Sequence, residues 1–462
     1  MSETRGTAPT PDGDKPGDRA VPVDRVQRRT IAVLAASQVL GGIGVATGVA
    51  VASLIASELS GSDAIAGLAQ TSAVVGAAVV ALPLSRLAAR GGRRGSLTSG
   101  YVVALAGALV AAAATWWGAW PLLLAGMLLF GAGSATGLAS RFTATDLARP
   151  ERRATDLSIV VWATTVGSVL GPNLAGVTEQ LGLLEGAPGD HAGHAGDATS
   201  PVPFLVAALA FAGAAAAVWL LLRPDPLRVA ADRAAAAAGG RADADVDVTA
   251  LPGVAATTTS RPGFREGLAA GWSVLRASPT AQLALGAIVV SHLVMVGLMS
   301  MTPVHMNHGG ASLQVVGVVI SAHIAGMYVL SPVIGWLADR WGHARVLGAG
   351  GVVLLVSAVT VAGAPSDDAA RLTVGLVLLG VGWSCGLVAG SALLIDGTPP
   401  AHRTAVQGLS DFSMNLGGAL GGVLAGVVIA VASYAVLAWC AAVLLGAYLM
   451  VLVWKMPRRR VA

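Results

Sequence analysis

The sequence predicts an all-α integral membrane protein, with twelve transmembrane helices arranged as two pseudo-symmetric six-helix bundles. Hydrophobic residues make up 55% of the 462 positions and charged residues only 12%, whereas soluble proteins carry about a quarter charged residues. The charges fall between apolar runs of about 20 residues, each long enough to cross about 30 Å of hydrocarbon. An internal repeat supplies the third observation, because it divides these runs into two equivalent halves.

The repeat has one constant offset of 250 residues. With that shift, segment 146–176 aligns without a gap on segment 396–426, and segment 85–97 aligns on segment 335–347. One offset in two separated blocks indicates two bundles of the same topology. If the protein has a substrate site, we expect it between the two bundles near the membrane midplane.

The hydropathy pattern divides the chain into five parts. They are a disordered cytoplasmic tail (1–30), an N-terminal six-helix bundle (31–222), a cytoplasmic linker (223–280), a C-terminal six-helix bundle (281–454) and a basic cytoplasmic tail (455–462). The expected spans are 31–55, 65–87, 97–117, 119–140, 157–180, 203–222, 281–303, 313–337, 345–363, 371–395, 405–430 and 433–454. Within the linker, segment 264–279 has the pattern of an amphipathic helix that lies on the inner membrane surface.

The basic residues predict the orientation in the membrane. Of the 29 Lys and Arg residues, only Arg371 falls in a loop that follows an odd-numbered span. By the positive-inside rule both termini are therefore cytoplasmic, in a multi-pass protein of a bacterial cytoplasmic membrane. The net charge of +4 reflects this arrangement and does not indicate nucleic-acid binding. The lipid bilayer is the expected partner, and a monomer is compatible with the sequence.

The loop between the eighth and ninth expected spans reads GWLADRWG over residues 335–342. It resembles the signature G-x-L-a-D-r-x-G-r of the major facilitator superfamily, and the resemblance covers all twelve spans. It implies a transporter, not an enzyme, in which Asp339 and Arg340 brace the cytoplasmic gate. The matching positions are Gly335, Asp339, Arg340 and Gly342, and the first-half copy keeps Arg90 and Gly92. Ala89 replaces the aspartate there, so we expect a weaker first-half brace.

Segment 292–327 is rich in sulfur and imidazole, with five of the ten methionines and four of the eight histidines. Met295 with Met299, and His323 with Met327, are pairs at i, i+4 spacing, so each pair lies on one helix face. Thioether and imidazole groups suit soft metals, above all copper(I). A histidine within the membrane is costly unless it is paired or faces a polar cavity, so His323 and His292, which lie at a similar depth, are candidates for a functional site.

The two pairs resemble a more specific pattern. MxxxM on the seventh span followed by HxxxM on the eighth is similar to the CcoA-type (CalT group) bacterial copper importers. The resemblance implies that Met295, Met299, His323 and Met327 bind copper as the transported substrate, with no resident cofactor, and His292 is a possible fifth ligand. Relatives in that group carry other compounds, including riboflavin-like molecules. The main alternative is therefore a proton-coupled exporter or importer of a small organic molecule.

Histidines in two outer loops are candidates for metal capture at the entrance. They are His305 and His308 after the seventh span, and His191 and His194 after the fifth. Exposed loop histidines are also common without any function, so both interpretations stay open.

Coupling and direction are open at the sequence level. Segment 167–176 resembles the gxxxGPxxGG motif of proton-coupled drug exporters, but the fourth span lacks the Arg and Gln of their LxxxRxxQG motif. Asp411, about two turns into the eleventh span, is either a proton site or a shallow residue near a helix N-terminus, where negative charge is favoured. A non-transporting sensor on the same fold is a third alternative.

Overall fold

The computed structural model describes residues 23–180, 200–245 and 264–455, and over these ranges the chain is helical. Twelve helical segments of the described chain are long and apolar enough to cross a membrane, which confirms the predicted fold class. The first bundle contains α1 (Val23–Ser60), α2 (Asp63–Gly91), α3 (Arg93–Trp117), α4 (Trp120–Phe130), α5 (Ala132–Thr143), η1 (Pro150–Arg152), α6 (Arg153–Gln180) and α7 (Val202–Leu221).

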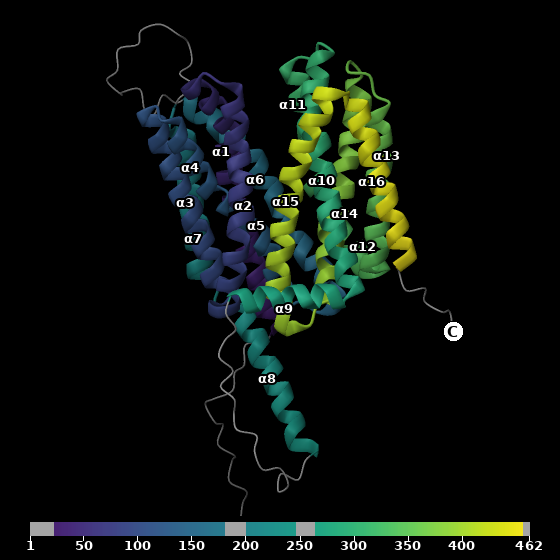
Figure 1. The fold of residues 1–462 in the computed structure, drawn as a ribbon. Helices are drawn as coiled ribbons and strands as arrows, with labels where there is room; N and C mark the ends of the chain where they lie inside the picture. The colour runs from purple at the N-terminus through teal and green to yellow at the C-terminus, as the bar shows by residue number, and fades with distance from the viewer. Residues whose placement is uncertain (1–22, 181–199, 246–263, 456–462) are drawn as a thin grey trace, which may run out of the picture.

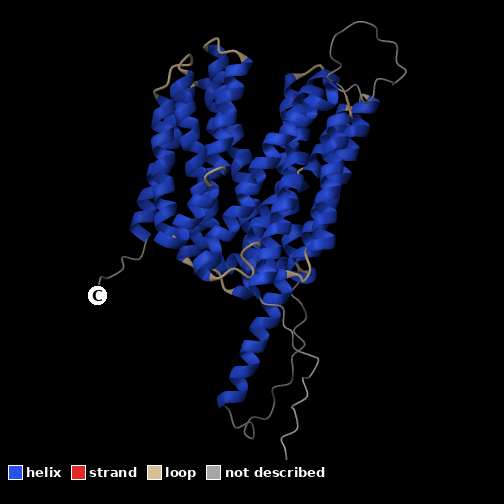
Figure 2. Cartoon of the chain, turned by 180° about the vertical axis from the view of Figure 1, so that it is seen from behind, coloured by secondary structure: helices blue, strands red, loops and turns tan. Residues whose placement is uncertain are grey.

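The linker contributes α8 (Pro226–Asp245) and α9 (Phe264–Ala277), and the second bundle follows. Its elements are α10 (Pro279–His308), α11 (Leu313–Tyr328), α12 (Ser331–Trp341), α13 (His343–Ala362), α14 (Ala369–Asp396), η2 (Pro400–His402), α15 (Arg403–Val431) and α16 (Tyr434–Lys455). Figure 1 shows the two bundles side by side, converging at the end that carries α8 and α9 and diverging toward the opposite end. The view from behind agrees (Figure 2).

We call the end with α8 and α9 the linker end; it is the end predicted to be cytoplasmic. The segment expected to form an amphipathic helix is α9, which crosses this end beneath α15 (Figure 1). Its Leu275 is buried, whereas Trp272 is exposed. Gly271 packs against Ala405 and Leu409 of α15. The helix thus turns one apolar side toward the bundle, and its place at the membrane surface stays a prediction.

Several boundaries differ from the sequence prediction, among them those of the first, fourth and eighth spans. Helix α1 begins at Val23, inside the segment expected to be a disordered tail, because its first turns already make contacts within the bundle. The Gln27 amide donates to the Ala144 carbonyl at 2.7 Å and to the Asp156 carboxylate at 2.8 Å. In addition, the fourth span is interrupted at Gly131, between α4 and α5, and the eighth between α11 and α12, where Pro332 lacks the backbone N–H that would donate to the Tyr328 carbonyl.

Candidate functional site

The eighth span presents His323 to the interior of the second bundle. Its side chain is fully buried, with 0% exposed surface. The Nδ1 atom lies 2.7 Å from the Leu376 carbonyl oxygen of α14, and a carbonyl only accepts, so Nδ1 carries the hydrogen. In the neutral ring, Nε2 then holds a free lone pair, and it has no hydrogen-bond partner among the described residues. Metal-binding histidines show this arrangement, in which one nitrogen is fixed by a backbone carbonyl and the other is free.

The turn from His323 to Met327 packs directly on α14. A Cβ atom at Gly380 would lie 2.5 Å from the His323 carbonyl oxygen and 2.7 Å from the Met327 backbone nitrogen. Only glycine therefore permits this approach. In the first bundle Gly131 approaches Ala73 and Ala77 in the same way, and these two alanines are 250 residues before His323 and Met327. The contact belongs to the shared scaffold, whereas the imidazole and the sulfur are specific to the second half.

The methionines of α10 lie in the same core of the second bundle. Met295 and Met327 are buried members of this core, and Met299 packs against it. Among the described residues no group of three or more His, Cys, Asp or Glu side chains could hold a metal ion. A metal site at this place would therefore depend on thioether sulfur.

His292 has a different environment from His323. Its Nδ1 accepts a hydrogen bond of 2.9 Å from the indole Nε1–H of Trp383. Indole only donates, so the proton of the neutral imidazole is on Nε2, which lies against Gly418 of α15. The role of His292 as a fifth ligand stays a prediction, and Nδ1 would have to leave Trp383 to take it.

The structure places two of the four outer histidines, and both belong to the last turns of α10 and not to a loop, because the helix continues beyond residue 303, the expected end of the seventh span. The His305 Nε2 lies 3.2 Å from the Ala364 carbonyl oxygen, and its ring stacks on Tyr434 with 4.4 Å between centroids. His308 is the last residue of α10 and is exposed. His191 and His194 lie outside the described residues. Metal capture by these four residues stays a prediction.

At the linker end, Asp339 of α12 reaches across to the first bundle. Its carboxylate accepts from the backbone N–H groups of Ala154 at 2.9 Å and Thr155 at 2.8 Å, and from the Thr155 hydroxyl at 2.6 Å. These N–H groups are at the start of α6, where a helix has unpaired donors and the positive end of its dipole. Asp339 therefore caps a helix of the other bundle.

The other signature residues support this contact unequally. A Cβ atom at Gly335 would lie 2.6 Å from the Ala154 carbonyl oxygen, so glycine permits the close approach of α12 and α6. Gly342 has a φ of +96° and the first-half Gly92 a φ of +90°, which favour glycine at both positions. Arg340 is exposed and lies 5.3 Å from the centre of the Trp336 ring. Its role as a brace stays a prediction, as does that of the exposed Arg90.

A second contact between the bundles joins Arg153 of α6 to Asp396 of α14. The other oxygen of Asp396 lies 2.6 Å from Nδ1 of His343, whose Nε2 is 3.4 Å from Asp339. His343 thus links the two carboxylates within the second bundle. In the alignment of the two repeats, His343 matches Arg93 of the first half.

Arg93 forms the equivalent contact in the first bundle. Its Nε and Nη2 donate to the Asp146 carboxylate at 2.8 and 3.0 Å, and Nη2 also donates to Gln407 of α15 at 2.7 Å. Burial raises the pKa of the Asp146 carboxyl above its ordinary value, although Arg93 opposes the shift. We call the contacts that Asp339, Arg153 and Arg93 make across the bundles the linker-end gate, together with the ion pair between Arg141 and Asp411 that is described next.

The deepest contact of this gate pairs Arg141 of α5 with Asp411 of α15 at 2.8 Å, with 1% and 6% of the two side chains exposed. The Arg141 Nε also donates to the Ser391 hydroxyl of α14 at 3.0 Å. Sequence reasoning singled out Asp411 but missed Arg141, which follows the expected end of the fourth span. The internal repeat could have pointed to Arg141. The offset of 250 residues aligns Arg141 with Ser391, so the charge is present in the first half only.

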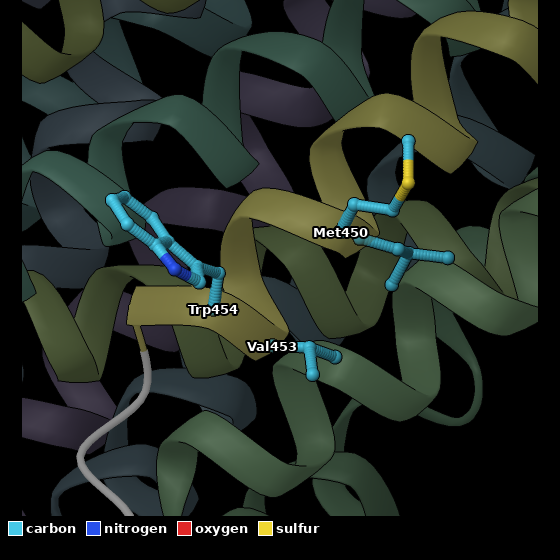
Figure 3. Close-up of a pocket in the computed structure, with 4 residues that line it drawn as sticks. Met450, Val453 and Trp454 are labelled. Carbon is cyan, nitrogen blue, oxygen red and sulfur yellow. The ribbon is translucent and has the colours of Figure 1, made fainter.

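A surface hollow lies away from both regions. It is lined by Leu449, Met450, Val453 and Trp454 near the end of α16 (Figure 3). Met450, Val453 and Trp454 are all exposed, and α16 is on the outer side of the second bundle (Figure 1). Its position is that of a lipid-facing surface with an interfacial tryptophan.

Comparisons with known proteins agree with this architecture. The sequence profile of the Major Facilitator Superfamily matches residues 33–312 and 285–462. The uncharacterized MFS-type transporter YdeG of Bacillus subtilis (strain 168) is 37% identical over 431 residues, which cover 93% of each chain. The riboflavin transporter RfnT of Brucella anthropi is 26% identical over 387 residues, which cover 84% of this chain and 85% of RfnT.

Among solved structures, the proton:xylose symporter XylE superposes with a TM-score of 0.70 at 12% identity. The superposition covers 94% of this chain and 97% of XylE. At this identity the likeness concerns the fold alone.

Proposed function

The chain belongs to the major facilitator superfamily, and from this premise we propose that it imports copper by alternating access through a Met/His site on α10 and α11. One observation carries the choice of cargo. His323 is fully buried with its Nδ1 fixed by a carbonyl and its Nε2 free, which is the arrangement expected of a ligand awaiting a metal ion.

The donor atoms of the two pairs suit a soft metal. Met327 follows His323 by one helical turn, and Met295 and Met299 stand one turn apart on α10. Three thioethers and one imidazole suit copper(I) better than magnesium or calcium, which prefer oxygen ligands. Thioethers do not titrate, so we expect copper binding to change little with pH as long as the imidazole of His323 stays neutral.

The arrangement of the bundles corresponds to one state of an alternating-access cycle. The linker-end gate is closed by the contacts of Asp339, Arg153 and Arg141 with the opposite bundle. Figures 1 and 2 show that the bundles diverge at the opposite end. In an alternating-access cycle a site between the bundles exchanges substrate with the opposite side when the linker end is closed, and an importer loads its substrate in this state.

Uptake of radioactive copper by a copper-import-deficient bacterium tests the proposal. Cells that express the intact chain should accumulate copper, and Met295→Ala, Met299→Ala, His323→Ala and Met327→Ala should each lose at least about 90% of this uptake, consistent with the tenfold or larger cost of disturbing a metal site. Met301→Ala is the matched control, because Met301 is a methionine of α10 outside the two pairs.

The control should retain uptake at equal membrane expression. Absence of uptake above background with the intact chain would exclude copper import. Uptake that none of the four substitutions changes would keep copper as the cargo but reject these ligands.

A small organic substrate is the second candidate, favoured by the similarity to a riboflavin transporter. His292, Trp383 and Tyr328 form an aromatic cluster in the second bundle, with Tyr328 and Trp383 edge to face at 5.7 Å between centroids. Such rings could stack on a planar substrate. Radioactive riboflavin given to the same cells tests this candidate, and uptake abolished by Trp383→Ala together with no copper uptake would support it over copper.

A further inference from the structure

The eighth span consists of two short helices, whereas its counterpart in the first bundle is one long helix. Helix α11 ends at Tyr328 and α12 begins at Ser331. In the first half, α2 continues through Pro83 without an interruption. The offset of 250 residues aligns Ser331 with Ala81. The interruption and the serine therefore occur in the half that carries the proposed copper ligands.

The two pieces of the eighth span are fixed to different bundles. On α11, Nδ1 of His323 binds the Leu376 carbonyl, and the same turn packs on Gly380 of α14. On α12, Gly335 and Asp339 contact the start of α6 in the first bundle. Opening the linker-end gate therefore removes contacts of α12 and leaves these contacts of α11 in place.

Both ends of α12 are joined to the neighbouring helices by residues outside regular helix. Val329 and Leu330 separate it from α11, and Gly342, with a φ of +96°, separates it from α13. A short helix between two such joints can shift as a unit, because hinge motions concentrate in a few residues at the ends of elements. Helix α12 can therefore follow the gate without carrying α11 with it.

Ser331 connects α12 to the turn that carries Met327. Its hydroxyl donates to the Met327 carbonyl oxygen at 3.2 Å, across the interruption. A hydroxyl has one hydrogen, so the Ser384 hydroxyl of α14, at 3.0 Å, donates to Ser331. Both serines are fully buried, with 0% exposed surface. Because water does not compete for them, these bonds fix the Met327 turn on α14 while the gate is closed.

We propose that the interruption is a hinge and that Ser331 and Ser384 are positioning residues, which hold Met327 at the copper site while the gate is closed. When α12 leaves α6, it carries Ser331 away from the Met327 carbonyl. The Met327 turn is then held less firmly, and the site binds copper less tightly. Copper is thereby held while the site faces outward and released when it faces the cytoplasm. The inference rests on the proposed copper import and its alternating-access cycle.

Distances between spin labels test the hinge without copper. Cys385 and Cys440 are replaced by serine, and the labels are attached in pairs that share Val443→Cys on α16 as their reference. Trp336→Cys reports the position of α12, and Val318→Cys reports the position of α11. All three labelled positions are exposed. The two pairs thus follow the two pieces of one span against the same point of the second bundle.

Asp339→Lys opens the gate for this measurement, because a cation then faces the positive end of α6. A third pair, Glu151→Cys in η1 and Ala401→Cys in η2, reports the opening between the bundles. In lipid nanodiscs we expect the Trp336–Val443 distance to change by at least about 2 Å, the size of helix shifts in switching proteins. The distance from α11 to α16 should stay the same.

The other outcomes overturn the hinge. If the gate opens and neither distance within the second bundle changes, the bundle moves as one rigid body. If both distances change equally, the eighth span moves as one piece. If the gate stays closed in Asp339→Lys, α12 does not hold it.

Copper(I) affinity, measured with a competing chelator, tests the positioning role. We expect Asp339→Lys to weaken copper binding about tenfold, which corresponds to the loss of roughly one neutral hydrogen bond. Ser331→Ala should weaken it by a similar factor, and Asp339→Lys should then have little further effect, because the link is already cut. If Ser331→Ala fails to fold, Ser384→Ala replaces it and should show the same loss of additivity.

Ser357→Ala is the matched control. The Ser357 hydroxyl is also fully buried and donates to the Gly375 carbonyl at 2.7 Å, away from the hinge. Its effect on copper affinity should add to that of Asp339→Lys. Full additivity for Ser331→Ala as well would overturn the positioning role. A chain that binds no copper would exclude copper as the cargo, while the metal-free distances would still decide the hinge, so the two proposals fail separately.

Discussion

Asp339→Ala is expected to open the linker-end gate and expose its interior to the cytoplasm. The substitution removes the acceptor of three hydrogen bonds from Ala154 and Thr155 and leaves the start of α6 uncapped. Hydrogen bonds to a charged group contribute about 1.5–3 kcal/mol each, and part of this is recovered when water enters. We expect the closed form to lose at least about 2 kcal/mol, which is a change of roughly thirtyfold in the ratio of closed to open forms.

The measurement uses Ser158→Cys as a reporter in a chain whose native cysteines are replaced. Ser158 is buried in the gate against Gly335, so a thiol there is protected while the gate is closed. A membrane-impermeant thiol reagent in inside-out vesicles should modify it much faster in the Asp339→Ala background. Val333→Ala is the matched control from the same helix and should change the rate little, because Val333 is exposed and is not one of the signature residues. If Ser158→Cys is modified equally fast with Asp339 and with Asp339→Ala, Asp339 does not hold the gate closed.

His323→Asn is expected to abolish copper uptake while it preserves the folded protein. The asparagine amide can take the place of Nδ1–H and donate to the Leu376 carbonyl, but it has no atom equivalent to Nε2. His323→Ala removes both functions and leaves a cavity in the core, because the imidazole is fully buried. The asparagine variant therefore separates ligand loss from loss of stability.

Uptake and thermal unfolding are measured together on the same preparations. For His323→Asn we expect an unfolding temperature close to that of the intact protein and uptake reduced at least tenfold, roughly the cost of losing a metal ligand. For His323→Ala both quantities should fall. Full uptake by the asparagine variant would show that Nε2 binds no cargo.

Most of the fold could be predicted because the membrane imposes it. Apolar runs of the required length and the distribution of arginines predicted the spans, and twelve such segments are present in the described chain. The interruption of the eighth span was missed although Pro332 signals it, since hydropathy does not distinguish a continuous helix from a broken one. The early start of α1 was missed because Gln27 is polar, and only its bonds to Ala144 and Asp156 reveal that it faces the bundle interior.

The candidate site could be predicted only as pairs of residues on separate helices. The spacing paired Met295 with Met299 and His323 with Met327. Nothing in the sequence indicated that the Leu376 carbonyl binds Nδ1 of His323. Nor did it indicate that the Trp383 indole donates to Nδ1 of His292. Arg141 was assigned to a cytoplasmic loop by its charge. Its partner Asp411 is 270 residues away and belongs to the other bundle, so the pair depends on how the two bundles meet.

Copper(I) loading of the purified protein, followed by X-ray absorption spectroscopy at the copper edge, tests the central claim most directly. We expect one copper ion per chain with a first shell dominated by sulfur and completed by one imidazole nitrogen. His323→Asn should lose the nitrogen, and Met295→Ala with Met327→Ala should lose sulfur. A copper shell of oxygen and nitrogen alone, unchanged in these variants, would contradict a Met/His transport site on α10 and α11.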